Sequence, residues 1–113
     1  MYSDREQHMA ASRAMCETLE ASGDARTIVR EIDHWAYFPC PDSRARFVEA
    51  ALEAGLRLRG TSEPMGLWET YGAQVYHLDV PSDEAIDAVT LLLLDLAANA
   101  GGDYDGWETR IVA

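Results

Sequence analysis

Two histidines and a cysteine are the side chains with the clearest metal-binding chemistry. His34 and His77 fall on two strands that are expected to pair, and Cys40 follows the first of them. A structural zinc ion takes four nitrogen or sulfur ligands at a regular spacing. The spacing here fits no zinc pattern and leaves one ligand short. We therefore interpret the histidines as hydrogen-bonded side chains of the fold and predict no metal site.

Paired carboxylates offer a second chemistry, because two acids in one pocket can act as general acid and base. Asp83 and Asp87 lie at the start of an expected helix, and Asp103 and Asp105 lie in an expected turn. Helix starts and turns favour carboxylates without any catalysis. No nucleophile elbow, phosphate-binding loop or dinucleotide-binding glycine pattern occurs in the sequence. We therefore predict no catalytic residue and no cofactor. Of the functions considered below, a small enzyme ranks third, after a protein-binding regulator and a homodimeric interaction domain.

The elements that must position these side chains follow from periodicity and from glycine and proline breaks. A capping box at Ser3 and Glu6 predicts a helix to about Ser22. After it we expect strands over 27–38, 56–61, 67–80 and 107–112, and helices over 42–54 and 83–100, the last capped by Ser82. The helix over 42–54 should bury Phe47, Val48, Ala51 and Leu52. Gly72 is predicted to mark a bulge or bend, and residues 104–106 a turn.

The order of these elements indicates the fold class. Without the first helix it reads β-α-β-β-α-β, the split βαβ order of an α+β, ferredoxin-like fold with a four-stranded antiparallel sheet. At 113 residues the chain is expected to be one domain over 27–113 with an N-terminal helical extension over 1–23. One sheet face should carry the two later helices. The other face is solvated, covered by the first helix or used for binding.

The charge is unevenly distributed. The net charge is −11, and residues 60–113 hold ten acidic side chains against Arg110 alone. Such a surface repels nucleic acid and anionic membranes and attracts basic partners, so we expect an arginine-rich protein segment as partner. The charged start and the two isolated cysteines, Cys16 and Cys40, predict a cytoplasmic protein with reduced thiols.

A family resemblance extends over almost the whole chain. It is carried by a run in the last helix, by the segment that follows and by a strand bearing Ile32 and His34; the C-terminal pieces are Ala85-Ile86-Asp87-Ala88, Leu96-Ala97, Tyr104-Asp105-Gly106-Trp107 and Thr109. These pieces resemble the signature of the bacterial ribonuclease E inhibitors of the RraB family. The resemblance implies a non-enzymatic regulator that binds ribonuclease E near its arginine-rich region and restrains RNA decay. Family members carry an acidic extension after this signature, whereas the present sequence stops at Ala113. If that extension contributes to binding, the resemblance implies weaker inhibition or a different target here.

The last helix presents a conflict of pattern that points to a contact surface. Leu91 and Leu94 fall opposite its predicted core face, among carboxylates. Either the N-terminal helix covers these leucines, or a partner or a second subunit does. Together with the segment after the helix, this surface supplies our predicted partner-binding residues: Glu84, Asp87, Leu91, Leu94, Asp95, Tyr104, Asp105 and Trp107. The main rival interpretation is a homodimeric interaction domain of unrelated purpose that uses the same surface.

Aromatic side chains gather on strands that are expected to be neighbours, namely Trp35, Tyr37, Tyr76 and Trp107. In RNA-recognition sheets such residues stack on bases. Phosphate repulsion by the acidic surround should outweigh a stacking gain of about 1–3 kcal/mol per base. We therefore predict that these aromatics pack in the core or bind protein. For Trp107 both interpretations stay open, since a tryptophan that enters a strand also packs well.

Overall fold

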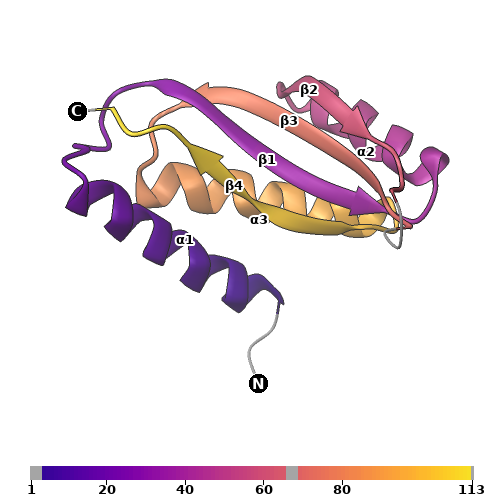
Figure 1. Ribbon diagram of the computed structural model, residues 1–113, viewed down its shortest axis with the longest axis horizontal. Coiled ribbons are helices and arrows are strands. Elements are labelled where there is room, and N and C mark those ends of the chain that lie inside the picture. The colour runs from indigo at the N-terminus through magenta and orange to yellow at the C-terminus, as the bar shows by residue number, and fades with distance from the viewer. Residues whose placement is uncertain (1–3, 66–68, 113) are drawn as a thin grey trace.

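The computed structural model describes residues 4–65 and 69–112, which form one antiparallel sheet and three helices (Figure 1). The elements are α1 (Asp4–Ala21), β1 (Arg30–Phe38), α2 (Pro41–Glu53), β2 (Arg57–Ser62), β3 (Tyr71–Asp79), α3 (Asp83–Asn99) and β4 (Asp103–Thr109). The predicted α+β class, with a helix first, is confirmed. The predicted cap Ser3 and the predicted strand start at Leu67 lie outside the described residues.

The four strands are ordered β2-β3-β1-β4, and each neighbouring pair is antiparallel. The central strand β1 pairs with β3 along its whole length, from Arg30 opposite Asp79 to Phe38 opposite Tyr71. Alternate residues of a strand face opposite sides of the sheet. The side chains of β1 that point to the helices are therefore the buried ones: Ile32, His34, Ala36 and Phe38.

The core lies between the sheet and two helices, α2 and α3, which cover the same face (Figure 1). Phe47 and Ala51 of α2 are buried in it, in agreement with the predicted helix face. The prediction for Leu52 was wrong, because its side chain is 48% exposed. It lies in a shallow groove beside Leu58 of the edge strand β2. An edge strand has no neighbour on its outer side, so this flank of α2 remains uncovered.

Two predicted features of the strands were also wrong. Residues 104–106 do not form a turn; they belong to β4, where the register against β1 shifts between Trp35 and Ala36 and leaves a bulge. Pairing with β1 overrides the local turn preference, since the bulge absorbs the extra residue. Gly72 is no bulge either, because it pairs regularly with Tyr37. It is small because a Cβ there would overlap the hydroxyl of Ser62 and approach the Tyr37 ring to 3.1 Å.

A buried ion pair holds the segment that connects α1 to the sheet. The guanidinium of Arg30 contacts the carboxylate of Asp24, and both side chains are fully buried. Asp24 also accepts hydrogen bonds from the backbone N–H groups of Arg26 at 2.7 Å and Val112 at 3.0 Å. The Arg30 hydrogen bonds hold the pKa of this carboxyl well below its usual range. The pair thus ties the segment that follows α1 and the segment that follows β4 to β1.

Candidate functional site

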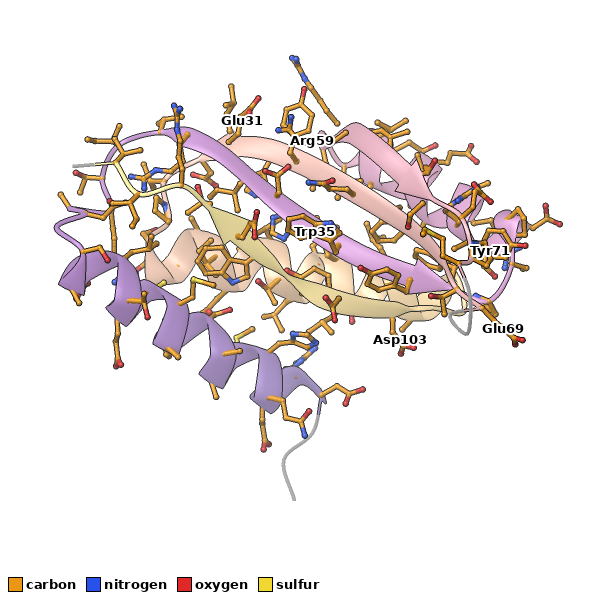
Figure 2. All side chains as sticks on the ribbon, viewed as in Figure 1. Glu31, Trp35, Arg59, Glu69, Tyr71 and Asp103 are labelled. Atoms are coloured by element: carbon orange, nitrogen blue, oxygen red, sulfur yellow. The ribbon has the colours of Figure 1, made fainter. Side chains whose placement is uncertain are left out.

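The candidate site lies on the sheet face that α2 and α3 leave uncovered (Figure 2). On β1, four side chains alternate with the buried ones and point to this face: Glu31, Asp33, Trp35 and Tyr37. Trp35 and Tyr37 are half-buried. The N-terminal helix does not lie across this face, because α1 packs against α3 beside β4 (Figure 1). The open face is therefore a surface of aromatic rings and carboxylates.

An arginine already occupies one part of this face. The guanidinium carbon of Arg59 on β2 lies 4.1 Å from the centroid of the Tyr76 ring. Its Nε is 2.5 Å from Oδ1 of Asp33, and its Nη2 is 3.0 Å from Oε2 of Glu31. A planar guanidinium gains both from an aromatic face and from carboxylate acceptors. Arg59, Tyr76, Asp33 and Glu31 form a cluster in which the cation and both carboxylates are already paired. We call it the Arg59 cluster.

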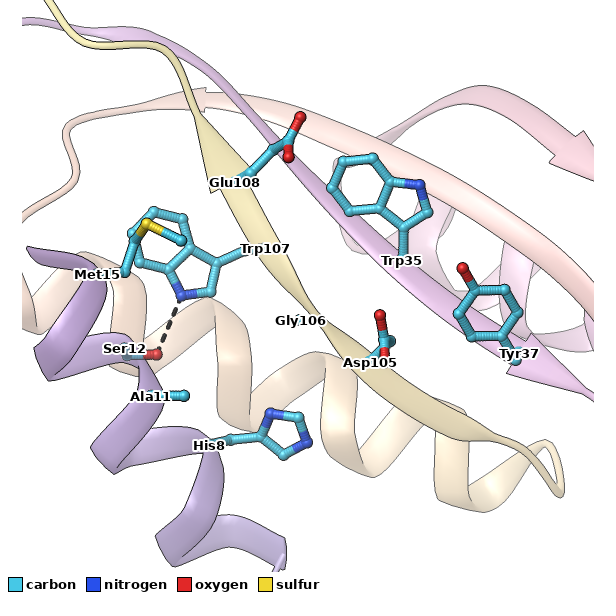
Figure 3. Close-up of a pocket in the computed structure, with 10 residues that line it drawn as sticks. All are labelled: His8, Ala11, Ser12, Met15, Trp35, Tyr37, Asp105, Gly106, Trp107 and Glu108. Carbon is cyan, nitrogen blue, oxygen red and sulfur yellow. Dashed lines mark hydrogen bonds between the residues drawn. The ribbon is translucent and has the colours of Figure 1, made fainter. Parts of the chain in front are cut away.

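A pocket of about 440 Å³ lies on the other side of β1, between this strand and α1 (Figure 3). It passes over the edge strand β4 at Gly106, which pairs with Trp35 in register. A Cβ built at Gly106 would meet nothing within 4 Å, so the space above the strand is open there. Gly106 has a φ of 155°, a conformation that favours glycine. We call this cavity the Trp35 pocket.

The inner wall of the Trp35 pocket is formed by Trp107 and α1. The indole Nε1 of Trp107 donates a hydrogen bond to Oγ of Ser12 at 3.0 Å, and Ser12 is buried. Met15 lies beside the indole ring in Figure 3. Trp107 is half-buried in this contact. Its side chain thus both packs within the protein and lines the pocket, so the two interpretations of this residue are not exclusive.

Two carboxylates, Asp105 and Glu108, border the Trp35 pocket on either side of Gly106 (Figure 3). Both side chains are exposed. Within residues 4–65 and 69–112, neither forms a hydrogen bond or an ion pair with another residue. Asp33 on the same face is different, since Arg59 already neutralises it. The pocket therefore combines aromatic walls with two acids that have no cation of their own.

The predicted contact residues on α3 lie in a different environment. Asp87 is paired with Arg13 of α1 at 2.5 Å, and Asp83 is paired with Arg13 at 3.0 Å and with Arg26. These contacts hold the pKa of Asp83 below its usual value, with the Arg26 hydrogen bond as the largest cause. Glu84 and Asp95 are exposed. The acidic start of α3 is thus largely neutralised inside the molecule, by arginines from the first third of the chain.

Leu91 and Leu94 are both half-buried, and Leu94 packs against the core. The prediction that Leu94 lies opposite the core face was therefore wrong. Four and seven residues after Asp87, the two leucines share its flank of α3, the flank on which Arg13 of α1 docks. The helical-wheel prediction assumed that α3 buries one face only. Because α3 packs against the sheet and also against α1, it buries a wider part of its circumference. Leu92 is the leucine of α3 that is exposed, at 37%.

Tyr104 belongs to a buried polar chain rather than to the surface, since its side chain is only 5% exposed. Its hydroxyl lies 2.8 Å from Nδ1 of His34, and Nε2 of His34 lies 3.0 Å from Nε2 of His77. Burial lowers the pKa of His34 to about 3, with a smaller contribution from His77, and burial also lowers the pKa of His77. Burial raises the pKa of the Tyr104 hydroxyl. The two histidines thus form hydrogen bonds inside the fold, as predicted.

The side chains with metal-ligand chemistry do not cluster in the described part of the chain. No group of three or more histidine, cysteine or acidic side chains in residues 4–65 and 69–112 is arranged to hold a metal ion. Cys16 is buried and Cys40 is half-buried, and both are free thiols.

Trp35 and Tyr37 were predicted to pack in the core or to bind protein, but they were not in the predicted partner-binding set. Glu108 and the α1 residues that line the pocket were not in that set either: His8, Ala11, Ser12 and Met15. The alternation along β1 and β4 was a usable signal for an outward position of Trp35, Tyr37 and Glu108. What it could not show is that α1 lies beside β4 and closes one side of a cavity. That arrangement brings residues 8–15 next to residues 105–108.

Comparison with known proteins adds a family to this geometry. A family model described as Regulator of ribonuclease activity B matches residues 9–109, from within α1 to the last residue of β4. No curated protein matches the chain. Among the helices that the structure describes, none is both long and apolar enough to cross a membrane.

Proposed function

Because the chain belongs to the regulator of ribonuclease activity B family, we propose that it is a non-enzymatic, acidic protein that binds ribonuclease E and restrains RNA decay. It would act in the cytoplasm, which its two free cysteines support. We also infer a ferredoxin-like arrangement of the domain, supported by the strand order β2-β3-β1-β4.

One observation carries the protein-binding part of this proposal. Most of the carboxylates in the second half of the chain are exposed and make no ion pair within the described segments: Glu69, Glu84, Asp95, Asp103, Asp105 and Glu108. Uncompensated charge of one sign speeds association with an oppositely charged partner and opposes binding of RNA. An arginine-rich segment of the ribonuclease is the partner that this surface fits.

We propose that the contact surface includes the accessible members of the predicted set. Glu84, Asp95 and Asp105 are exposed, and Trp107 is half-buried in the wall of the Trp35 pocket. Leu91 and Leu94 would contribute through their exposed portions. Asp87 would first have to leave Arg13, and Tyr104 would support the surface from inside the fold.

The test is a titration of labelled protein with purified ribonuclease E at increasing salt, together with an RNA cleavage assay. We expect binding that weakens roughly tenfold between low and moderate ionic strength, because salt screens exposed charges. We also expect RNA cleavage to slow as the protein saturates the enzyme. Absence of binding at low salt, or binding without any effect on cleavage, would contradict the proposal.

A second candidate is self-association, favoured by two exposed leucines that line one shallow groove. Leu78 of β3 is 65% exposed and Leu92 of α3 is 37% exposed, and the groove they share measures about 400 Å³. Apolar side chains gathered in this way mark subunit contacts in many proteins. Sedimentation of the protein with and without Leu78→Ser decides this point: a dimer that dissociates in the variant supports self-association, and a monomer in both excludes it.

A further inference from the structure

We propose that the Trp35 pocket binds an arginine side chain of an extended, arginine-rich segment in a protein partner. The guanidinium would lie against the Trp35 ring and pair with Asp105 and Glu108. This inference rests on the proposed function for the identity of the partner, and it adds the place and the chemistry of the contact.

The Arg59 cluster shows the same kind of contact within the protein itself. In the Arg59 cluster, a guanidinium lies over the ring of Tyr76 and pairs with Asp33 and Glu31. The Trp35 pocket offers the same combination, an aromatic ring with two carboxylates, on the next part of the same face (Figure 2, Figure 3). Here, among the described residues, no arginine supplies the cation. The pocket thus has the composition of the Arg59 cluster without its central residue.

The charges around the pocket also select a cation. Asp105 and Glu108 are exposed and carry no ion pair within residues 4–65 and 69–112, whereas Arg13 and Arg26 already neutralise the start of α3. A partner cation at α3 would have to compete with those arginines. At the Trp35 pocket it would meet two free acids, so it gains attraction without displacing an internal pair.

The shape of the pocket favours a flat group over a round one. Gly106 lies opposite Trp35 and has no side chain to shield the ring, and a volume of about 440 Å³ leaves room for a side chain and the backbone that carries it. An arginine guanidinium is planar, stacks on aromatic rings and is more weakly hydrated than the ammonium of lysine. We therefore expect the pocket to prefer arginine to lysine.

The probe for this inference is a fluorescein-labelled peptide of six Arg-Gly repeats, titrated with the full chain, beside a matched peptide of six Lys-Gly repeats. The pocket variant is D105N/E108Q, which keeps side-chain shape and removes both charges. The matched control is E49Q/E53Q, which removes two exposed charges from α2, outside the proposed contact surface. We expect the pocket variant to lose at least about tenfold in affinity for the arginine peptide and the control about twofold or less, because the two charge pairs with the guanidinium disappear only in the former.

A second measurement keeps the result independent of net charge. In spectra of the ¹⁵N-labelled protein, the arginine peptide should shift the indole N–H of Trp35 strongly, and Trp35→Leu should weaken binding with the charges unchanged. Equal losses in the pocket variant and the control, equal binding of both peptides, or an unperturbed Trp35 indole would each overturn the inference.

The two titrations test different claims: the ribonuclease E titration tests the proposed function, and the peptide titration tests the assignment of the Trp35 pocket. If the chain does not bind ribonuclease E but D105N/E108Q still abolishes arginine-peptide binding, the proposed function is wrong and the pocket assignment stands. If the chain binds ribonuclease E but the pocket variant and the control bind the peptide alike, the pocket assignment is wrong and the proposed function stands.

Discussion

The indole Nε1 of Trp107 donates a hydrogen bond to Oγ of Ser12 at 3.0 Å and so connects β4 to α1 across 95 positions of sequence. Ser12 is 1% exposed, although serine in the middle of a helix usually faces water. The contact explains its burial, because the hydroxyl accepts from the indole. It also fixes α1 as one wall of the Trp35 pocket.

Ser12→Ala tests how much this hydrogen bond stabilises the docking of α1. The substitution leaves the Trp107 N–H without its partner, and we expect the free energy of unfolding in urea to fall by about 1–2 kcal/mol. Ser22→Ala, an exposed serine beyond the end of the same helix, is the matched control and should change stability little. In a Trp107→Phe background, which lacks the N–H, the Ser12→Ala loss should largely vanish. A loss of full size in that background would show that Ser12 acts through packing instead.

Asp24→Ala should be among the most destabilising single changes in the chain. It leaves the fully buried Arg30 guanidinium without its carboxylate and removes the acceptor of the Arg26 and Val112 N–H groups. Removal of one partner of a buried ion pair costs about 3–5 kcal/mol. Urea denaturation measures it, with Glu49→Ala on the exposed side of α2 as the control. A change below about 1 kcal/mol would mean that water reaches Arg30.

The same ion pair makes stability depend on acid. The pKa of Asp24 is lowered in the folded protein, chiefly by the Arg30 hydrogen bonds. A carboxyl with a lowered folded pKa contributes its stabilisation above its unfolded pKa of about 4 and loses it as the pH falls below that value. The Asp24→Ala variant should therefore lose less stability than the wild type between pH 4 and more acidic conditions. Parallel stability curves for the two proteins would contradict this linkage.

His34 predicts a second pH dependence, nearer to neutrality. Its folded pKa of about 3 lies below the ordinary value of 6.5, so the folded protein keeps it neutral while the unfolded chain takes up a proton. Its contribution to stability is complete above pH 6.5 and falls by about 1.4 kcal/mol per pH unit below it. Proton NMR of the imidazole should show no titration of His34 between pH 7 and 5. Titration near pH 6.5 would refute the burial of a neutral ring.

Gly72→Ala tests the close contact between β2, β3 and the open sheet face. A Cβ at residue 72 would overlap the Ser62 hydroxyl and press on the Tyr37 ring, and we expect a loss of about 1–3 kcal/mol. Ser62→Ala in the same chain should recover part of it, because the overlapping oxygen is gone. Gly60→Ala is the control, since a Cβ there meets nothing within 4 Å. Equal effects at residues 60 and 72 would show that glycine flexibility, rather than space, sets the cost.

The local elements were predictable because their signals lie within a few residues of each other. The alternation from Ile32 to Phe38 separates the two faces of β1, and Gly55, with a φ of 98°, ends α2 where the sequence pattern ended the predicted helix. Both patterns depend on strand or helix periodicity, which the chain carries in itself. The acidic character of the second half of the chain is likewise a property of the sequence alone.

Only the tertiary structure decided which of those acids are free and what surrounds them. Asp87 is neutralised by Arg13, 74 positions away, whereas Asp105 has no such partner among the described residues. Residues 104–106 became part of a strand because β1 supplies the backbone partners that a turn would have replaced. The Trp35 pocket exists because Arg13, Ser12 and the Asp24–Arg30 pair hold α1 beside β4. Such contacts join residues far apart in sequence, so no local periodicity encodes them, and packing alone determines which carboxylates remain available to a partner.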